Sequence, residues 1–233
     1  MSLSESSSAY PKQHLYGRRK GRPLHKRKSR LMQELLPQWE ITLGGNAPLD
    51  PFELFDVRPV SIALEIGFGG GEHLAAQAAR RPESLLLGAE PFLNGVASAL
   101  RHLQEARLAN VRLHAGDARD LMACLPDACL DRVFILFPDP WPKLRHNKRR
   151  LIQPDFVAEA ARLLKAGGRL RFATDWADYA DQALATLRRS AHFEWLAEQA
   201  ADWSRPPADH VTTRYEEKKL GDCAPIWLEF RRL

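Results

Sequence analysis

Short apolar runs alternate with amphipathic segments along most of the chain, which predicts strands and helices in turn. The runs with the length of buried strands are residues 61–66, 84–89, 111–115, 130–137 and 169–174. The segments with helical spacing are residues 74–79, 93–108, 117–125, 153–165 and 179–189. Residues 193–198 and 226–231 alternate in the manner of strands and are expected to close the sheet as a hairpin-like edge. This order predicts the α/β class, with a doubly wound, mostly parallel sheet and an antiparallel edge.

The first strand ends in an acidic residue and three spaced glycines, Glu65-x-Gly67-x-Gly69-x-Gly71. Glycines allow positive φ and let a ligand approach the backbone, so a tight turn before a helix is expected there. The dinucleotide fingerprint would place its third glycine at position 72, which is Glu72. The pattern instead resembles the first motif of the S-adenosylmethionine (SAM) methyltransferase fold. A glycine turn that binds nothing is the alternative.

Acidic residues also follow the second and third predicted strands. Glu90 ends the second strand, where a carboxylate is placed to accept hydrogen bonds from ribose hydroxyls. It is equally suited to a helix N-terminus, which favours negative charge. Asp117 follows the third strand, at the position that meets the adenine in the SAM methyltransferase fold, and it could equally cap the next helix. The shared position of Glu65, Glu90 and Asp117 at strand ends favours ligand binding.

The positive charge is concentrated near the N-terminus. Residues 6–33 contain nine Lys and Arg and no Asp or Glu, whereas the rest of the chain has 25 basic and 29 acidic residues. Residues 1–34 are poor in apolar side chains and are expected to form a basic, disordered N-terminal extension to a domain at 35–233. Basic segments of this kind commonly bind nucleic acid, although a solvated tail and an organelle transit peptide remain alternatives.

The lead-in at residues 35–58 is expected to be loop-like because it contains prolines 37, 48 and 51. Its apolar side chains should pack on the edge of the domain, and they are Trp39, Ile41, Leu43, Phe52 and Phe55.

A stiff, charged loop follows the fourth strand, with the sequence Phe137-Pro138-Asp139-Pro140-Trp141-Pro142-Lys143 and then Leu144-Arg145-His146-Asn147-Lys148-Arg149-Arg150. Three prolines in five residues restrict the backbone. A solvated charge run would not require such a rigid start, which favours a functional loop. Trp141 is placed to stack on a base or on adenosine, or else to cap the core.

These residues resemble the bacterial tRNA (guanine-N7-)-methyltransferase family, and Thr174-Asp175-Trp176 and Thr213-Arg214-Tyr215-Glu216 also fit. The resemblance covers about residues 60–233 and implies a seven-stranded sheet of the SAM-dependent methyltransferase fold. It implies methyl transfer from SAM to N7 of guanosine 46 in the tRNA variable loop, in the cytoplasm. The last motif departs from the usual Thr-Lys-Phe-Glu, and Arg for Lys keeps the charge but changes the geometry.

The resemblance also assigns roles to particular residues. Those matched to SAM binding are Glu65, Gly67, Gly69, Gly71, Glu90, Asp117 and Asp139, and Asp139 is also matched to catalysis. Those matched to substrate binding are Lys143, Asp175, Thr213, Arg214, Tyr215 and Glu216. From their charge, the residues expected to hold RNA phosphates are Arg145, Lys148, Arg149 and Arg150.

The chemistry fits a site made of carboxylates. Guanine N7 has a lone pair and no proton, so its methylation requires no general base. His73 and His146 are the candidate bases, and we interpret the former as a helix residue beside the glycine turn and the latter as a phosphate donor. We expect no metal, and Cys124, Cys129 and Cys223 form no metal-binding pattern and indicate a reducing compartment. No apolar run has the length of a membrane span.

Other activities remain open. A methyltransferase acting on an exocyclic amino group would carry a second proline after Pro140, and here Trp141 follows. A non-catalytic, SAM-sensing RNA-binding protein would bind RNA without forming product. A polyamine synthase shares the fold, but its cationic substrate conflicts with the basic run at 143–150.

Overall fold

The computed structural model describes residues 23–44 and 48–233. Within these residues one mixed sheet has the strand order β3-β2-β1-β4-β5-β7-β6. The strands are β1 Ile62–Ile66, β2 Leu85–Ala89, β3 Val111–His114, β4 Leu130–Leu136, β5 Leu164–Thr174, β6 Phe193–Trp195 and β7 Ile226–Arg232. The first five strands pair in parallel, whereas β7 is antiparallel to β5 and β6 is antiparallel to β7. The predicted seven-stranded, doubly wound architecture with an antiparallel edge is confirmed.

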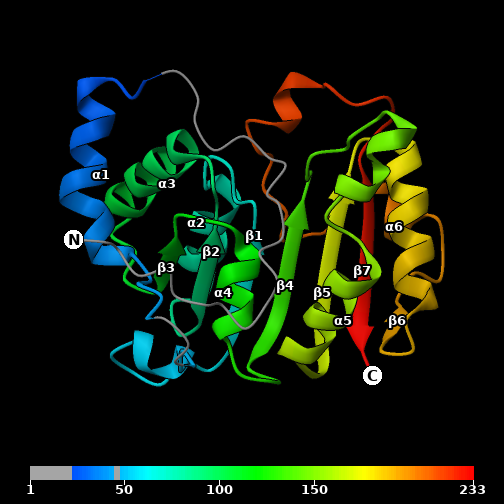
Figure 1. Cartoon of the computed structure of the whole chain (residues 1–233), viewed down its shortest axis with the longest axis horizontal. Coiled ribbons are helices and arrows are strands. Elements are labelled where there is room, and N and C mark those ends of the chain that lie inside the picture. Colours follow the sequence, from blue (N-terminus) through cyan, green and yellow to red (C-terminus); the bar gives the residue numbers. More distant parts are fainter. Residues whose placement is uncertain (1–22, 45–47) are drawn as a thin grey trace, which may run out of the picture.

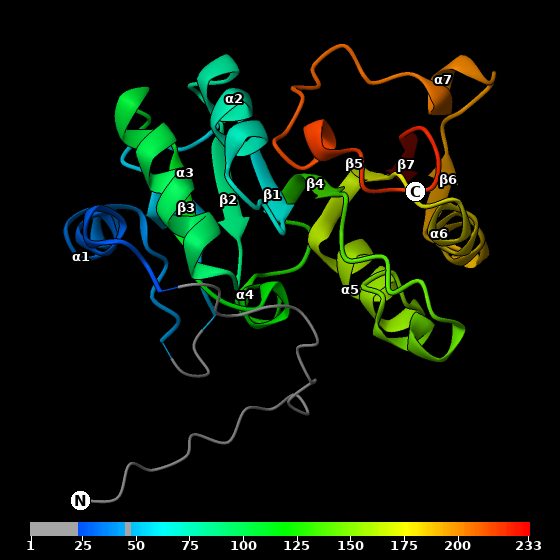
Figure 2. The ribbon, with the colours of Figure 1, turned by 90° about the horizontal axis from the view of Figure 1, so that it is seen from above.

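Helices cover both faces of the sheet (Figures 1 and 2). They are α1 Lys26–Trp39, α2 Glu72–Arg80, α3 Leu93–Glu105, α4 Ala118–Cys124, α5 Pro154–Leu163, α6 Ala177–Arg189 and α7 Ala201–Ser204, with 3-10 turns η1 Pro51–Leu54, η2 Leu144–Arg149 and η3 Glu216–Lys218. One apolar core packs α4, α5 and α6 against the sheet, and a second packs α1, α2 and α3 against the other face. The central strands β1 and β2 are buried along their whole length because both faces are covered.

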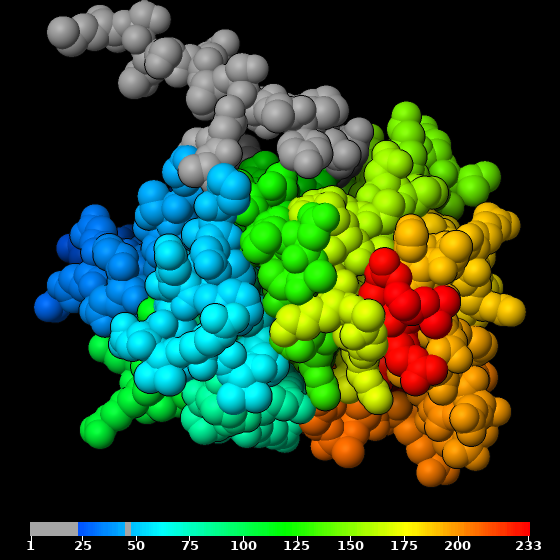
Figure 3. Space-filling view, turned by 90° about the horizontal axis from the view of Figure 1, so that it is seen from below, coloured from blue at the N-terminus to red at the C-terminus, as the bar shows by residue number. Residues whose placement is uncertain are grey.

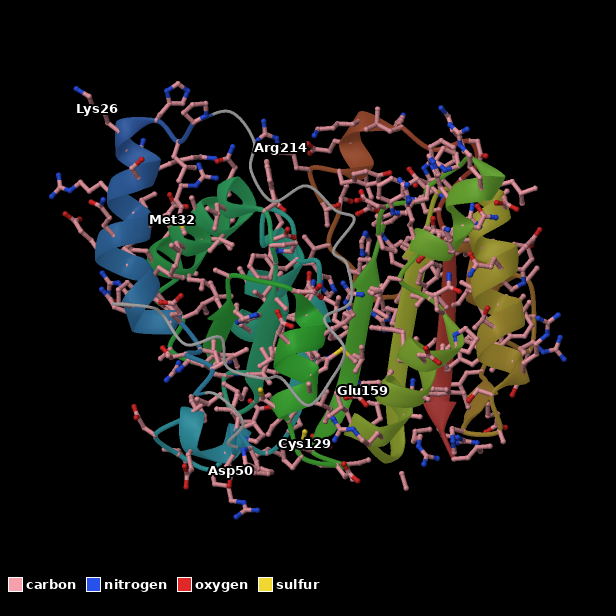
Figure 4. All side chains as sticks on the ribbon, viewed as in Figure 1. Lys26, Met32, Asp50, Cys129, Glu159 and Arg214 are labelled. Carbon is pink, nitrogen blue, oxygen red and sulfur yellow. The ribbon has the colours of Figure 1, made fainter. Side chains whose placement is uncertain are left out.

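The carboxyl ends of the parallel strands lie along the upper rim in Figure 1, together with η2, η3 and the start of α1. Figure 4 shows Lys26 and Arg214 at this rim, whereas Asp50 and Cys129 lie near the opposite edge. The C-terminus also lies at that lower edge, which faces the viewer in Figure 3. There the backbone N–H of Leu233 donates to the carbonyl of His192 (3.0 Å). The parallel strands therefore present their ligand-binding ends to one rim of the molecule.

The segment before the sheet differs from the prediction. Residues 26–39 form helix α1, although disorder was expected up to residue 34 and a loop from residue 35. Its buried face contains Leu35, Leu36 and Trp39, and the Trp39 indole donates to the carbonyl of Leu108 (2.9 Å). Burial against α3 outweighs the proline at position 37, which lies in the last turn of the helix. Residues 1–22 of the basic extension lie outside the described residues.

Smaller differences concern element ends. Helix α5 ends at Leu163 and β5 begins at Leu164, whereas the helix was predicted to reach residue 165 and the strand to begin at residue 169, so the glycine pair at 167–168 lies within the strand. Gly167 has φ +80° there. Strand β6 ends at Trp195 rather than at residue 198. The predicted packing of the lead-in is confirmed, because Trp39 and Ile41 are buried and Leu43, Phe52 and Phe55 pack against the core. In the part of the chain that the structure describes, no helix is long and apolar enough to span a bilayer.

Candidate active site

The turn after β1 is held by three glycines in the left-handed region, Gly67 (φ +72°), Gly69 (φ +53°) and Gly71 (φ +82°). Residues that carry a Cβ atom rarely adopt these backbone angles, so glycine is favoured at each position. A Cβ atom at Gly67 or Gly69 would have no atom within 4 Å, whereas one at Gly71 would lie 2.5 Å from the Cβ of Ala99. Gly71 thus allows α2 to pack on α3, and the first two glycines leave open space beside the backbone.

Glu90 closes this turn from the end of β2. Its carboxylate accepts hydrogen bonds from the backbone N–H groups of Gly69 and Phe92, both at 2.8 Å. Burial raises the pKa of Glu90 to about 7, these two hydrogen bonds oppose the rise, and the negative charges of Asp139 and Glu65 add to it. An acid of this kind, buried beside an open turn, is a strong candidate for ligand binding.

Asp117 has the capping role that was its alternative interpretation. It is the N-cap of α4, where its carboxylate accepts from the backbone N–H of Arg119 (3.0 Å) and pairs with the Arg119 guanidinium (2.5 Å). The side chain is nearly buried at the same strand edge as Glu90. Capping does not exclude a ligand contact, so the adenine role stays a prediction.

Glu65, in β1, is buried and paired with a histidine, and its contact with SAM stays a prediction. Its Oε2 atom is 2.8 Å from Nδ1 of His73, and both side chains are buried. His73 is therefore the partner of the strand-end acid. Its burial leaves it no access to a substrate, which argues against the catalytic base considered above.

The loop after β4 carries strained backbone. Phe137 (φ +52°) and Trp141 (φ +44°) adopt left-handed angles that aromatic residues rarely accept. Such strain clusters at functional sites, where the surrounding contacts over-determine it. Asp139 is exposed between these two residues. Trp141 is half-buried, with the Arg149 guanidinium 5.1 Å from its ring and the His146 ring 5.9 Å away.

Arg150 is the exception among the predicted RNA contacts. Only 1% of its side chain is exposed, and the guanidinium donates to the Pro140 carbonyl (2.7 Å), the Asp178 carboxylate (2.5 Å) and the Gln182 amide oxygen (3.0 Å). It also lies over the Tyr179 ring at 4.9 Å. We therefore correct the expectation that Arg150 contacts RNA, because it is a buried clamp between the loop and α6. Lys143, Arg145 and Lys148 are exposed on and beside η2.

The residues matched to substrate binding lie in two segments that touch. Asp175, at the end of β5, is buried and accepts a hydrogen bond from the Tyr215 hydroxyl (3.3 Å). The Tyr215 ring packs on Phe137, with centroids 5.5 Å apart. Burial raises the pKa of Tyr215, and the charges of Asp175 and Asp139 add to the effect. The substrate segment and the Asp139 loop thus face each other at the rim.

Thr213 and Glu216 form a capping box at η3. The Glu216 Oε2 atom accepts from the Thr213 backbone N–H (2.8 Å) and hydroxyl (3.0 Å), and the Thr213 hydroxyl accepts from the Glu216 N–H (3.4 Å). The other carboxylate oxygen is 2.9 Å from Nε2 of His210. These two side chains thus fix the local fold, and Arg214 between them is exposed at the rim (Figure 4).

In the described ranges, no group of three or more His, Cys, Asp or Glu is arranged to hold a metal ion. Cys124, Cys129 and Cys223 are free thiols. Burial raises the pKa of the Cys129 thiol to about 11, so it is inert at neutral pH.

The chain is similar to known methyltransferases over most of its length. A family described as "Putative methyltransferase" matches residues 59–227. The tRNA (guanine-N(7)-)-methyltransferase of Caulobacter vibrioides is 59% identical over 219 residues, which are 93% of this chain and 94% of the relative. That of Hyphomonas neptunium is 53% identical over 216 residues, covering 93% and 98%. The crystal structure of an rRNA methylase from Streptococcus thermophilus superposes with a TM-score of 0.52 at 14% identity, covering 78% of this chain and 90% of that one, which supports the fold alone.

Proposed function

The chain belongs to the tRNA (guanine-N7-)-methyltransferase family, and we propose that it uses SAM to methylate N7 of the guanosine at position 46 in the tRNA variable loop. The observation that carries the proposal is the position of Asp139. Its charge acts on the pKa of both Glu90, on the glycine-turn side, and Tyr215, on the substrate side. This supports a site in which one exposed carboxylate lies between the glycine turn and the Tyr215 segment.

The glycine edge fits SAM. The open space beside Gly67 and Gly69 admits a ligand against the backbone, and the Glu90 carboxylate is placed for ribose hydroxyls. Asp117 remains the proposed adenine contact, and Glu65, held by His73, remains a proposed SAM contact. SAM supplies an electrophilic methyl group on a sulfonium.

The protein's own work is to position and to stabilise charge. Guanine N7 supplies a lone pair and loses no proton, so the reaction needs no general base. The burial of His73 against Glu65 is consistent with this. Asp139 accepts hydrogen bonds from guanine N1–H and the amino group, which selects guanine over adenine. Its negative charge also stabilises the positive charge that develops on the base as the N7–carbon bond forms.

The tRNA surface is the basic rim. Lys143, Arg145 and Lys148 on the η2 side and Arg214 near η3 are exposed, and Lys26 lies at the start of α1 on the same rim (Figure 4). Cations at this rim neutralise phosphates around a variable-loop base presented to Asp139. An enzyme acting on tRNA is expected in the cytoplasm.

The test is incubation of the protein with unmodified tRNA and methyl-labelled SAM, followed by nucleoside analysis. We expect 7-methylguanosine from the variable loop. Asp139→Asn keeps the shape and removes the charge, and should lower kcat, measured at saturating SAM, by about 10²-fold. Asp181→Asn, an exposed acid on α6, is the matched control.

Other outcomes separate the alternatives. A different methylated nucleoside would keep the methyltransferase fold and overturn the substrate atom. No transfer by a protein that binds SAM and RNA would favour the sensing protein. Near-normal turnover by Asp139→Asn would remove Asp139 from catalysis.

A further inference from the structure

A long insert, residues 196–225, joins β6 to β7 and carries the Thr213–Glu216 motif. Figure 2 shows it over the right-hand strands of the sheet, on the side of α2. Asp209 is its anchor, because its carboxylate contacts Arg171 of β5 (2.6 Å), Arg81 after α2 (3.4 Å) and Arg132 of β4 (3.5 Å). The insert is thus fastened to residues of distant parts of the chain.

Gln77 of α2 is fully buried at this junction and its amide orientation is determined by its neighbours. The Arg81 guanidinium, which can only donate, lies 2.5 Å from Oε1 of Gln77. The Gln77 Nε2 atom then points the other way and donates to the backbone carbonyl of Asp209 (2.7 Å). Helix α2 therefore holds the insert by a buried hydrogen bond to its main chain.

The same amide fixes the state of His73. The second Nε2 hydrogen of Gln77 faces Nε2 of His73 at 3.2 Å, so that ring nitrogen must accept. The proton then resides on Nδ1, which donates to Oε2 of Glu65 (2.8 Å). Donation thus diverges from the Gln77 amide: one hydrogen goes to the Asp209 carbonyl, and the other begins a path through His73 to the strand-end acid.

The chain of contacts continues into the substrate motif. His210 follows Asp209 directly, and its Nε2 atom is 2.9 Å from Oε1 of Glu216. Its ring stacks 6.3 Å from the His73 ring and meets Trp227 of β7 at 4.4 Å. The buried path thus connects Glu65, in β1, with the capping box that shapes the substrate segment.

We propose that His73 and Gln77 are positioning residues that hold the insert, and with it Tyr215, in register with the cofactor edge. The identity of the substrate rests on the proposed function, but the positioning does not. Tyr215 bonds to Asp175 and packs on the strained Phe137, so a displacement of the insert would move the wall that faces Asp139. The Gln77 amide uses its oxygen and its nitrogen in buried contacts, and a buried polar group held in this way favours a single arrangement.

The experiment uses Gln77→Met, which conserves volume and helix propensity but removes every hydrogen bond of the amide. Hydrogen exchange of the free full-length protein should show amides at 208–217 exchanging about tenfold faster, with those of β1 and β2 unchanged. The KM for tRNA should rise about tenfold, with SAM affinity within about twofold. His73→Asn, which removes the Nε2 acceptor, should produce the same pattern and provides a second variant if the first folds poorly.

Asn110→Leu is the matched control. Asn110 is a buried amide that donates to the carbonyls of Ala78, Arg81 and Ser84 at and just after the C-terminal end of α2, and none of these three residues belongs to the insert. The proposal would be overturned if the amides at 208–217 exchanged at the wild-type rate in Gln77→Met. It would also be overturned if they exchanged as fast in Asn110→Leu as in Gln77→Met. The exchange measurement needs no methyl transfer, so failure of the proposed function would be seen separately in the wild-type nucleoside analysis.

Discussion

Glu90 should make the stability of the free protein fall as pH rises. Its pKa is raised from the ordinary value of 4.5 to about 7, chiefly by burial. The folded protein therefore holds this proton more tightly than the unfolded chain does, so protonation stabilises the fold. That contribution is fully present below about pH 4.5 and is lost as pH rises through about 7. At 1.36 kcal/mol for each pKa unit, the loss is about 3 kcal/mol.

Glu90→Gln isolates this effect. Glutamine has nearly the shape of the protonated acid and does not ionise, so it keeps a neutral group at every pH. Its Nε2 atom cannot accept, so one of the hydrogen bonds from Gly69 and Phe92 is lost, which lowers the stability of the variant by the same amount at every pH. The free energy of unfolding of the variant relative to that of the wild type should therefore rise by about 2–3 kcal/mol between pH 5 and pH 8. The difference between the two proteins is the quantity to follow, because other groups titrate in both.

The assay is urea denaturation without SAM at a series of pH values, with the slope m checked for constancy. Glu83→Gln removes an exposed carboxylate just before β2 and is the control, which should leave the difference near zero throughout. SAM affinity should meanwhile fall in Glu90→Gln, because the amide is a poorer acceptor for ribose hydroxyls. The wild type is thus expected to lose stability at neutral pH by keeping a buried acid that binds the cofactor, and the variant to escape that loss of stability but lose SAM affinity.

The reasoning would be refuted by a Glu90→Gln difference that is independent of pH, or that shrinks as pH rises. Either result would mean that the buried carboxylate is not destabilised in the folded state, and that the hydrogen bonds from Gly69 and Phe92 outweigh burial.

Three further predictions concern the loop, the turn and the rim. Arg150→Met should lower the free energy of unfolding, measured by urea denaturation, by about 2–3 kcal/mol, because a buried guanidinium with three hydrogen-bond partners is lost. It should also reduce methyl transfer, because the Pro140 carbonyl in the Asp139 loop loses its donor. Unchanged turnover would contradict the role of Arg150 as a clamp. Gly95→Ala places a Cβ atom 2.3 Å from the Gly69 carbonyl oxygen, so SAM affinity measured by calorimetry should fall about tenfold, whereas Gly44→Ala, with nothing within 4 Å, should be neutral. In the double variant Arg145→Ala, Lys148→Ala, the slope of the logarithm of the tRNA binding constant against the logarithm of the salt concentration should fall in magnitude by about one for each residue replaced. An unchanged slope would mean that this part of the rim does not contact RNA phosphates.

Helix α1 shows where local signals were insufficient. Pro37 and the dense positive charge favoured loop and disorder, yet Leu35, Leu36 and Trp39 share one face at helical spacing. Burial of that face stabilises the helix only because α3 packs against it, and α3 begins more than fifty residues after the end of α1 in the chain. Single-sequence reasoning cannot weigh a contact whose partner it has not placed.

The RNA-facing residues illustrate the same limit for charge. Arg149 and Arg150 are adjacent and chemically identical, but Arg150 is buried against α6 and Arg149 lies over Trp141. The difference depends on Asp178 and Gln182, which reach Arg150 only after α6 has packed beside the loop. Likewise, Thr213 and Glu216 carry a capping-box spacing that can be found in the sequence, although family resemblance alone had suggested a substrate role.

The sequence by itself determined the order of strands and helices, the glycine turn and the acids at the strand ends, because hydrophobic period and positive φ are local requirements. It also carried the loop motif by which the family is known. Only the tertiary structure decided that Glu65 faces His73, that Gln77 reaches the main chain of Asp209, and that Arg150 is a clamp. These are contacts between segments far apart in the chain, and their energies depend on burial, which no local pattern contains.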